Sequence, residues 1–126
     1  PVKAHQNRFY HLMAWGGVEG PSWGRLEQAG VSHASLVFSI AVLPALAEEV
    51  AFRGLLQHWL ESTLKPSRAL LLASAFFMFL HFSVPSAPYL FLLSLALGWA
   101  KQATGSLYPS ILIHFLHNLA ALELFD

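Results

Sequence analysis

The chain has 126 residues, of which 56% are hydrophobic and 11% are charged, with seven Lys and Arg against seven Asp and Glu. Average soluble domains contain roughly 45–50% apolar and about 25% charged residues, so charge is sparse for a soluble domain of this size. The composition excludes a disordered chain and a nucleic-acid binder. The lack of cysteine excludes a disulfide scaffold, an iron–sulfur protein and a cysteine-ligated zinc site. A membrane protein or an unusually apolar soluble bundle remains.

Residues 1–32 form a polar lead-in that is expected to be rich in loops, because charged, histidine and glycine residues recur along it. Its aromatic residues Tyr10, Trp15 and Trp23 have two interpretations. They form an aromatic belt at a membrane interface, or they are loop aromatics that pack on the rest of the chain. We therefore predict two parts, the lead-in and an apolar helical domain over residues 33–126.

Four apolar blocks follow the lead-in, and they span residues 34–60, 69–82, 89–100 and 107–125. The connectors between them contain proline or glycine, which favour turns. Leu, Ala and Phe dominate the blocks and β-branched residues are few, so helix is favoured over strand. Apolar residues cover most of the circumference, which is typical of buried or membrane helices. The first and last blocks reach the length of about 20 residues that spans a bilayer. The predicted fold is an all-α, polytopic membrane bundle of about four helices.

The first block carries three charged residues, Glu48, Glu49 and Arg53. Such groups are costly in hydrocarbon and usually face a bundle interior or a water-filled cavity. Glu49 and Arg53 are four residues apart, so they are predicted to pair along one helix face. Glu48 points about 100° away from Glu49 and is left without that partner. A carboxylate in this position is suited to general acid–base catalysis.

The second and fourth blocks carry the other polar groups. Phe77 and His81 are four residues apart, as are His114 and Asn118, which gives the last helix two hydrogen-bond donors on one face. At about 1.5 Å per residue, the polar groups of three helices lie at similar depth, about 17–18 Å from one end of the bundle. We therefore predict that they form one site. His117 is interpreted as a packed, hydrogen-bonded core residue.

These residues give the motifs E-E-x-x-x-R, F-x-x-x-H and H-x-x-x-N in the strings AEEVAFRGLL, FFMFLHF and SILIHFLHN. With all three in order on separate apolar helices, the chain resembles the CPBP family of intramembrane proteases over about residues 34–122. This is the CAAX prenyl protease and bacteriocin-processing (Abi) group. The resemblance implies a multi-pass membrane endopeptidase of the bacterial cytoplasmic membrane. Its implied substrates are prenylated, membrane-associated or transmembrane proteins or peptides.

Carried over by motif position, the resemblance implies that Glu48 activates water with help from His81, and that His114 and Asn118 hold the oxyanion. It implies a supporting role for three more side chains: Glu49, Arg53 and Phe77. No cofactor is favoured. The alternative, from older descriptions of the family as metalloproteases, is a zinc site formed by Glu48, His81 and His114. The chain lacks the H-E-x-x-H motif that is typical of such sites.

Two alternatives to a protease stay open at this point. One is a non-catalytic membrane scaffold or a bacteriocin self-immunity factor that has kept the bundle. The other is a proton or ion pathway built from the same charged cluster. The expected partners are membrane lipid and a membrane-bound substrate. Because most family members carry more helices around the motif core, we also expect a closed cavity to need an oligomer or additional helices.

Overall fold

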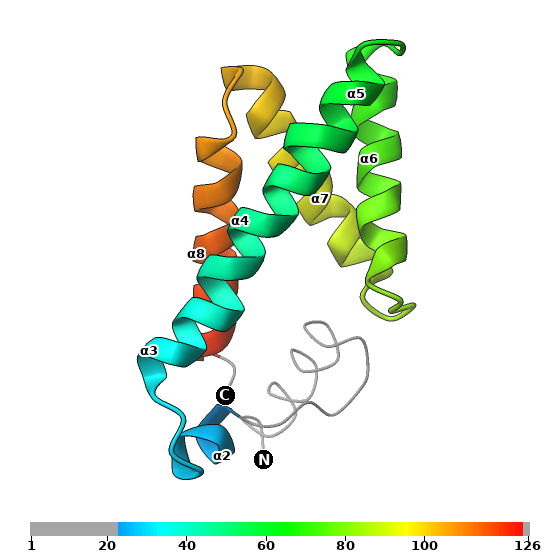
Figure 1. Ribbon diagram of the computed structural model, residues 1–126. Helices are drawn as coiled ribbons and strands as arrows, with labels where there is room; N and C mark the ends of the chain where they lie inside the picture. Colours follow the sequence, from blue (N-terminus) through cyan, green and yellow to red (C-terminus); the bar gives the residue numbers. More distant parts are fainter. Residues whose placement is uncertain (1–22, 125–126) are drawn as a thin grey trace.

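The structure, a computed structural model, describes residues 23–124, which form helices joined by short turns (Figure 1). Tyr10 and Trp15 of the predicted lead-in lie outside the described residues. The described end of the lead-in departs from the expected loop, because it contains a short helix, α2 (Trp23–Gln28). The turn after α2 is made at Gly30, whose φ of +93° lies in the left-handed region that glycine tolerates.

One continuous helix of 29 residues runs from His33 to Glu61. It begins where the Ser32 side chain accepts a hydrogen bond from the backbone N–H of Ser35 (3.2 Å), which is a standard N-cap. Two of its segments are π-helical, with wider turns than an α-helix. From its N-terminus the segments are α3 (His33–Leu36), η1 (Val37–Val42), α4 (Leu43–Glu49), η2 (Val50–Gln57) and α5 (His58–Glu61).

Three further helices complete the bundle: α6 (Pro66–Leu80), α7 (Ala87–Thr104) and α8 (Tyr108–Leu124). Proline in the first turn of α6 and of α7 fixes φ where no intrahelical N–H bond is needed. α7 ends at Gly105, whose φ of +67° is the left-handed helix cap. Figure 1 shows α6 and α8 on opposite sides of the long helix, with α7 packed against both of them. Residues from α4, α6 and α8 therefore reach a common interior.

The all-α prediction is confirmed for the described residues, whereas the prediction of four membrane spans is not. Among the described residues, only the helix His33–Glu61 is long and apolar enough to cross a membrane, with a mean hydropathy of 1.7 in its most apolar window. The core helix of a soluble protein passes the same test. The last block was predicted to reach span length, and the described part of its helix, α8, has 17 residues, at the lower end of the range of about 17–25 residues that span a bilayer.

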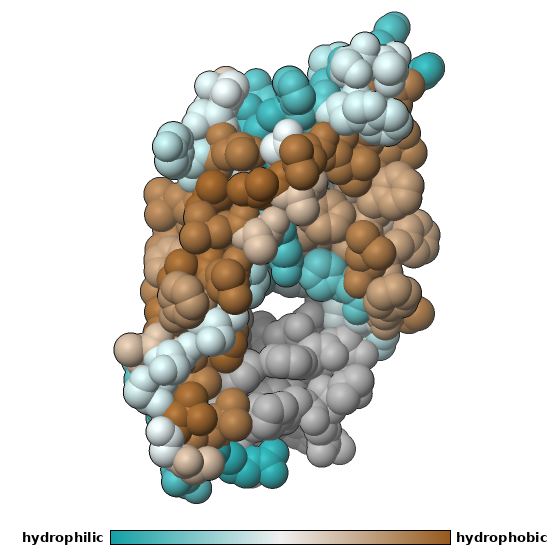
Figure 2. Space-filling view, in the orientation of Figure 1, coloured by the Kyte–Doolittle hydropathy of each residue, from teal (hydrophilic) through white to brown (hydrophobic). Residues whose placement is uncertain are grey.

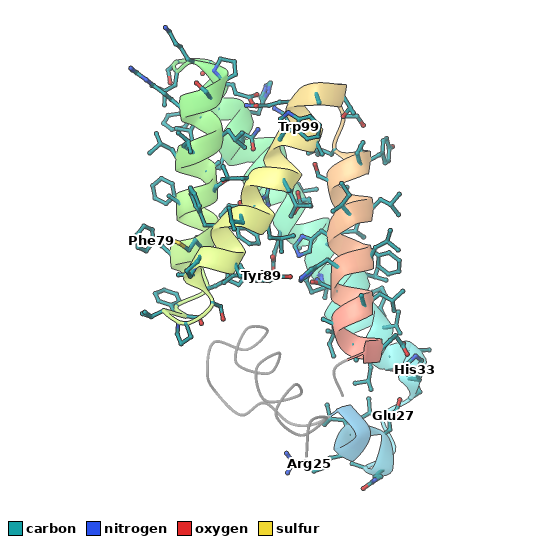
Figure 3. The ribbon with its side chains drawn as sticks, turned by 180° about the vertical axis from the view of Figure 1, so that it is seen from behind. Arg25, Glu27, His33, Phe79, Tyr89 and Trp99 are labelled. Carbon is teal, nitrogen blue, oxygen red and sulfur yellow. The ribbon has the colours of Figure 1, made fainter. Side chains whose placement is uncertain are left out.

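Apolar side chains lie on the outside of the bundle and polar ones inside it. Phe79 of α6 and Trp99 of α7 point outward (Figure 3) and are 68% and 65% exposed. Figure 2, which views the molecule from the opposite side, as in Figure 1, shows apolar surface over most of the helices there and hydrophilic surface at the end that carries the α5–α6 and α7–α8 turns. The largest fully buried side chains include several polar ones: Arg53, Gln57, Glu49, Ser74, Ser86, Ser94 and Ser110. Phe77 and Leu97 are buried with them, so the interior is mixed, and this many buried polar side chains beside exposed large apolar ones is unusual for a soluble domain.

Candidate active site

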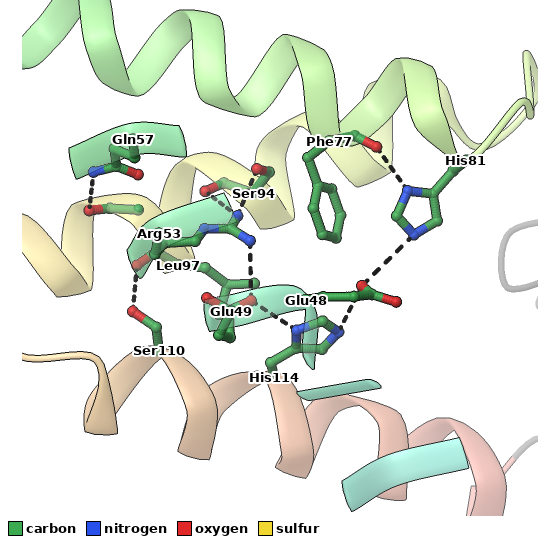
Figure 4. A network of polar contacts seen from close by, with 11 residues as sticks. Glu48, Glu49, Arg53, Gln57, Phe77, His81, Ser94, Leu97, Ser110 and His114 are labelled. Atoms are coloured by element: carbon green, nitrogen blue, oxygen red, sulfur yellow. Dashed lines mark hydrogen bonds and ion pairs between the residues drawn. The ribbon is translucent and has the colours of Figure 1, made fainter. Parts of the chain in front are cut away.

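Glu49 and Arg53 form the buried ion pair that their spacing predicts. Nη1 of Arg53 donates to Oε1 of Glu49 at 2.9 Å, and both side chains are at most 1% exposed. Nη2 of Arg53 donates to the carbonyl oxygen of Ser94 on α7 at 2.9 Å and to its hydroxyl at 2.5 Å. A buried ion pair is tolerated only when such additional hydrogen bonds satisfy it. The pair therefore fixes the long helix against α7 (Figure 4).

The contact between these two helices continues toward the α5 end as a series of polar bonds. Nε2 of Gln57 donates to the carbonyl oxygen of Gly98 (3.2 Å) and to Oε1 of Glu61 (3.0 Å). Lys101 pairs with the other oxygen of Glu61. A Cβ added at Gly98 would lie 2.6 Å from Oε1 of Gln57 and 2.4 Å from Cδ1 of Leu70. A side chain at position 98 would therefore displace Leu70 and the Gln57 amide that joins the long helix to α7.

His114 connects the buried pair to α8. Its Nδ1 lies 2.8 Å from Oε1 of Glu49, and its ring is 4% exposed. A carboxylate can only accept here, so Nδ1 carries a hydrogen and donates. The other ring nitrogen, Nε2, lies 3.8 Å from Oε2 of Glu48. Glu49 thus orients the histidine so that its second nitrogen faces the adjacent glutamate.

His81 lies at the C-terminal end of α6, where the helix stops. Its Nδ1 lies 2.7 Å from the carbonyl oxygen of Phe77, which belongs to the last turn and has no helical N–H to accept from. Nδ1 therefore donates, and Nε2 lies toward Oε2 of Glu48 at 3.9 Å. The chain turns at Phe82, which has a φ of +50°. The Phe77 ring packs on His81 and also lies 4.8 Å from the Arg53 guanidinium carbon, a cation–π contact.

Glu48 lies where these histidines converge. Its side chain is 33% exposed, and its Oε2 faces one ring nitrogen from α6 and one from α8 (Figure 4). The distances of 3.9 and 3.8 Å exceed those of hydrogen bonds. The Glu48 carboxylate and the Nε2 atoms of His81 and His114 do not bond to one another, and each can therefore form a hydrogen bond to a bound molecule. Figure 2 shows hydrophilic atoms recessed between the apolar surfaces of α4 and α6.

Asn118 has a different neighbour from the one that its spacing suggests. Its Oδ1 lies 3.0 Å from Nδ1 of His117, and Nε2 of His117 is bonded to the hydroxyl of Tyr89. This confirms that His117 is a packed, hydrogen-bonded residue. Within residues 23–124, no hydrogen bond joins Asn118 to His114 or to Glu48. The predicted grouping of three helices is therefore observed for Glu48, His81 and His114, with Asn118 beside it.

The zinc alternative finds no matching geometry. Its three proposed ligands, Glu48, His81 and His114, are neighbours. Yet in the part of the chain that the structure describes, no three His, Cys, Asp or Glu side chains are grouped so that they could hold a metal ion.

Several residues that shape the site were missed in the sequence. Gln57 continues the spacing of four that begins at Glu49 and Arg53, and that series would have identified it. Ser94 carries no such signal. Nor does Ser110, whose hydroxyl donates to the carbonyl oxygen of Leu97 on α7 at 2.7 Å. A serine that bonds to the backbone of another helix looks like any other small residue in an apolar block.

The geometry defines an all-helical protein with a cluster of carboxylate, histidine and arginine side chains between its helices. A family model described as type II CAAX prenyl endopeptidase Rce1-like matches residues 30–120, which include every residue of this cluster. The chain therefore belongs to this Rce1-like family of membrane endopeptidases, which confirms the resemblance seen in the sequence. No curated protein and no solved structure matches the chain.

Proposed function

We propose that the chain is a multi-pass intramembrane endopeptidase in which Glu48, with His81, activates the water that attacks a peptide bond. Family membership supports peptide-bond hydrolysis. The single observation that carries the choice of residues is the approach of Glu48 Oε2 to nitrogens of His81 and His114, which come from two other helices. The proposed location is the cytoplasmic membrane of a bacterium.

The outward-facing apolar side chains support the proposal that the long helix, α6, α7 and α8 are all embedded in lipid. Monomeric soluble proteins rarely expose contiguous apolar patches larger than a few hundred Å². Here large exposed side chains occur on every one of these helices, among them Leu55, Phe79, Leu92 and Leu112. α7 has 18 residues, about 27 Å at 1.5 Å per residue, which is close to the hydrocarbon thickness of about 30 Å. Contact with lipid would remove these exposed apolar side chains from water, which favours a membrane location.

The proposed reaction needs no nucleophilic side chain. A water between Glu48 and His81 gives a proton to the Glu48 carboxylate as its oxygen attacks the scissile carbonyl carbon. The carbonyl π electrons move onto the oxygen and form a tetrahedral oxyanion. The protonated Glu48 then gives its proton to the leaving nitrogen as the C–N bond breaks. The products are a carboxylic acid and an amine, and Glu48 returns to its starting state.

His114 and Asn118 are proposed to hold the oxyanion, where one such donor commonly contributes roughly 3–4 kcal/mol to the transition state. Because Nδ1 of His114 donates to Glu49, Nε2 can donate only when the ring carries both protons. The Glu49 carboxylate fixes the orientation of the ring through Nδ1. Arg53 and Phe77 hold this carboxylate and His81 in place. The proposed substrates are prenylated, membrane-associated or transmembrane proteins or peptides, since an apolar setting suits any of them.

Replacing Glu48 by Gln tests the proposal, because the amide keeps the shape but cannot accept the proton. In proteoliposomes with prenylated and transmembrane test peptides, we expect cleavage to fall by about 10²–10⁴-fold. Glu123→Gln is the matched control, since Glu123 is an exposed residue that pairs with His33, and it should cleave like wild type. Unchanged cleavage in Glu48→Gln rejects the mechanism. A biological activity that survives this substitution at normal protein level indicates the scaffold or immunity alternative.

No cofactor takes part in the proposed mechanism, and this is tested separately. The purified wild-type protein is assayed for bound metal, and its cleavage rate is measured before and after treatment with a chelator. We expect less than stoichiometric metal and an unchanged rate. A stoichiometric zinc ion together with chelator inhibition would replace the glutamate mechanism by a metal-dependent one.

A further inference from the structure

Tyr89, His117 and Asn118 form a hydrogen-bonded chain that the proposed mechanism does not use. Tyr89 lies in the first turn of α7 and points toward α8 (Figure 3). Its hydroxyl bonds to Nε2 of His117, whose Nδ1 lies 3.0 Å from Oδ1 of Asn118. All three side chains are half-buried. The chain therefore joins two helices and ends on a residue that is proposed to bind the oxyanion.

The polarity of this chain follows from the hydrogens that each group has. Oδ1 of Asn118 can only accept, so Nδ1 of His117 must carry a hydrogen and donate to it. In the neutral ring, Nε2 is then unprotonated and accepts the hydrogen of the Tyr89 hydroxyl. In this arrangement the Tyr89 hydroxyl donates to Nε2, and a His117 ring with its hydrogen on Nδ1 requires an oxygen, and not a nitrogen, at the near side of the Asn118 amide.

This matters because the two ends of an amide have nearly the same shape and opposite hydrogen-bonding roles. An unrestrained Asn118 can rotate by half a turn and present Oδ1 in place of Nδ2. An oxygen next to a developing oxyanion repels it, whereas the N–H group stabilises it. Asn118 is one helical turn from His114, which contacts Glu49 inside the site. Turning Oδ1 toward His117 leaves Nδ2 as the end that is free to donate to substrate.

We propose that Tyr89 and His117 are positioning residues that hold the Asn118 amide in the orientation that donates to the oxyanion. The inference rests on the proposed function and extends it to Tyr89 and His117, which none of the three motifs specifies. Neither residue needs to touch the substrate. Their effect passes through Asn118 alone, and this separates the proposal from a general role in packing α7 against α8.

The kinetic test is Tyr89→Phe, which removes one hydroxyl and keeps the ring. We expect kcat to fall about tenfold with KM unchanged, less than the 10²–10³-fold loss of a whole oxyanion donor. Tyr108→Phe is the matched control, because Tyr108 is 83% exposed, and it should match wild type. In an Asn118→Ala background, Tyr89→Phe should cause no further loss. A loss of equal size in that background, or no loss in wild type, overturns the proposal.

A conservative replacement of His117 adds a second kinetic test. In His117→Asn, an amide N–H group can take the place of the Nδ1 hydrogen, but the Nε2 atom that contacts Tyr89 is lost and the new amide can itself rotate, so kcat should fall about as far as in Tyr89→Phe. Tyr89→Phe should then have no effect in this background. If His117→Asn is as sensitive to the loss of the hydroxyl as wild type, the tautomer has no part in catalysis and the inference is wrong.

Nitrogen NMR of histidine-labelled protein in lipid checks the chain without any activity. The His117 signals are assigned by their loss in His117→Asn. We expect a hydrogen on Nδ1 and none on Nε2 in wild type, and a mixture of tautomers in Tyr89→Phe. The opposite tautomer in wild type overturns the inference while the effect of Glu48→Gln stands. If Glu48→Gln cleaves like wild type, the proposed function falls and the positioning role falls with it.

Discussion

Glu48 and Glu49 are adjacent on α4, yet they belong to two regions of different character. Glu49 is fully buried, and one of its oxygens accepts from both Arg53 and His114. Glu48 is 33% exposed and lies near two histidine nitrogens without a hydrogen bond to either. A rotation of about 100° around one helix separates these environments. The other oxygen of Glu49, Oε2, is buried without a hydrogen bond. Burial and the pair with Arg53 make Glu49 structural, whereas partial exposure leaves Glu48 available for chemistry.

The two regions also differ in how their helices are held. The structural region, defined by Glu49, Arg53 and Gln57, binds the long helix to backbone and side-chain groups of α7. The reactive region, defined by Glu48 and His81, joins α4 to the end of α6 through no hydrogen bond of its own. It depends on the structural region for its geometry. Substitutions in the structural region should therefore lower the free energy of unfolding, whereas substitutions in the reactive region should lower cleavage and leave stability nearly unchanged.

The largest expected effect on stability follows from Arg53→Met. It leaves Glu49 as a buried charge without its cation, and breaking one partner of a buried pair costs about 3–5 kcal/mol. We expect a lower melting temperature and a smaller free energy of unfolding in detergent. The double variant Glu49→Gln/Arg53→Met should recover much of the loss, because no unpaired charge remains. A double variant less stable than Arg53→Met alone would contradict this account.

Gly98→Ala should have the next largest effect. The added Cβ would lie 2.4 Å from Cδ1 of Leu70 and 2.6 Å from Oε1 of Gln57, so both side chains must shift, and the Gln57 amide is held in place by its bond to the Gly98 carbonyl oxygen. Overpacking of this kind costs about 1–3 kcal/mol. Gly54→Ala is the matched control on the long helix, since its nearest contact would be 3.2 Å, to a flexible leucine tip. Equal losses in both variants would show that glycine at 98 has no special role.

Ser110→Ala tests a single hydrogen bond between α7 and α8. The buried hydroxyl donates to the carbonyl oxygen of Leu97 at 2.7 Å, and losing such a bond costs about 1 kcal/mol. Thermal unfolding measures this loss. Ser106→Ala serves as a comparison in the turn before α8, where the hydroxyl accepts from the backbone N–H of Tyr108. We expect Ser110→Ala to be the more destabilising, and the reverse order would refute its role in helix packing.

Glu48→Gln should have the smallest effect on stability, within about 0.5 kcal/mol of wild type, because its partly exposed carboxylate makes no buried hydrogen bond. The same protein preparation is used for the cleavage assay, so that loss of activity and loss of fold are compared directly. A loss of stability as large as that of Arg53→Met would move Glu48 into the structural region and remove the contrast between the two glutamates.

The sequence was sufficient to predict the helices and the contacts within one helix. The Glu49–Arg53 pair followed from spacing alone, and the common depth of the motifs correctly brought Glu48 near His81. Both predictions depend on the rise and turn of an α-helix, which hardly vary between proteins. The short helix at Trp23–Gln28, by contrast, was hidden by its polar and glycine-rich surroundings.

Contacts between helices could not be predicted in the same way. The bond from His114 to Glu49 depends on how α8 crosses α4, and no spacing within either helix encodes that crossing. Arg53 and Gln57 donate to the backbone carbonyl oxygens of Ser94 and Gly98. Every residue has a carbonyl oxygen, so the sequence does not mark these acceptors. The requirement for glycine at 98 arises only once α7 lies against the long helix. These contacts depend on how the helices pack, and the number of apolar residues in a block does not predict helix packing.

The bond between Arg53 and Ser94 has a consequence for how the chain is made. The two residues are 41 positions apart, so during synthesis Arg53 is made well before its second partner. Until then, its only charged partner is the glutamate one turn earlier. Before α7 is made, Nη1 of Arg53 can pair with Glu49, but Nη2 lacks the Ser94 acceptors that it has in the folded chain. Arrest of the nascent chain just before residue 94 should leave Arg53 without this partner, and continued synthesis should allow the bond between the long helix and α7 to form.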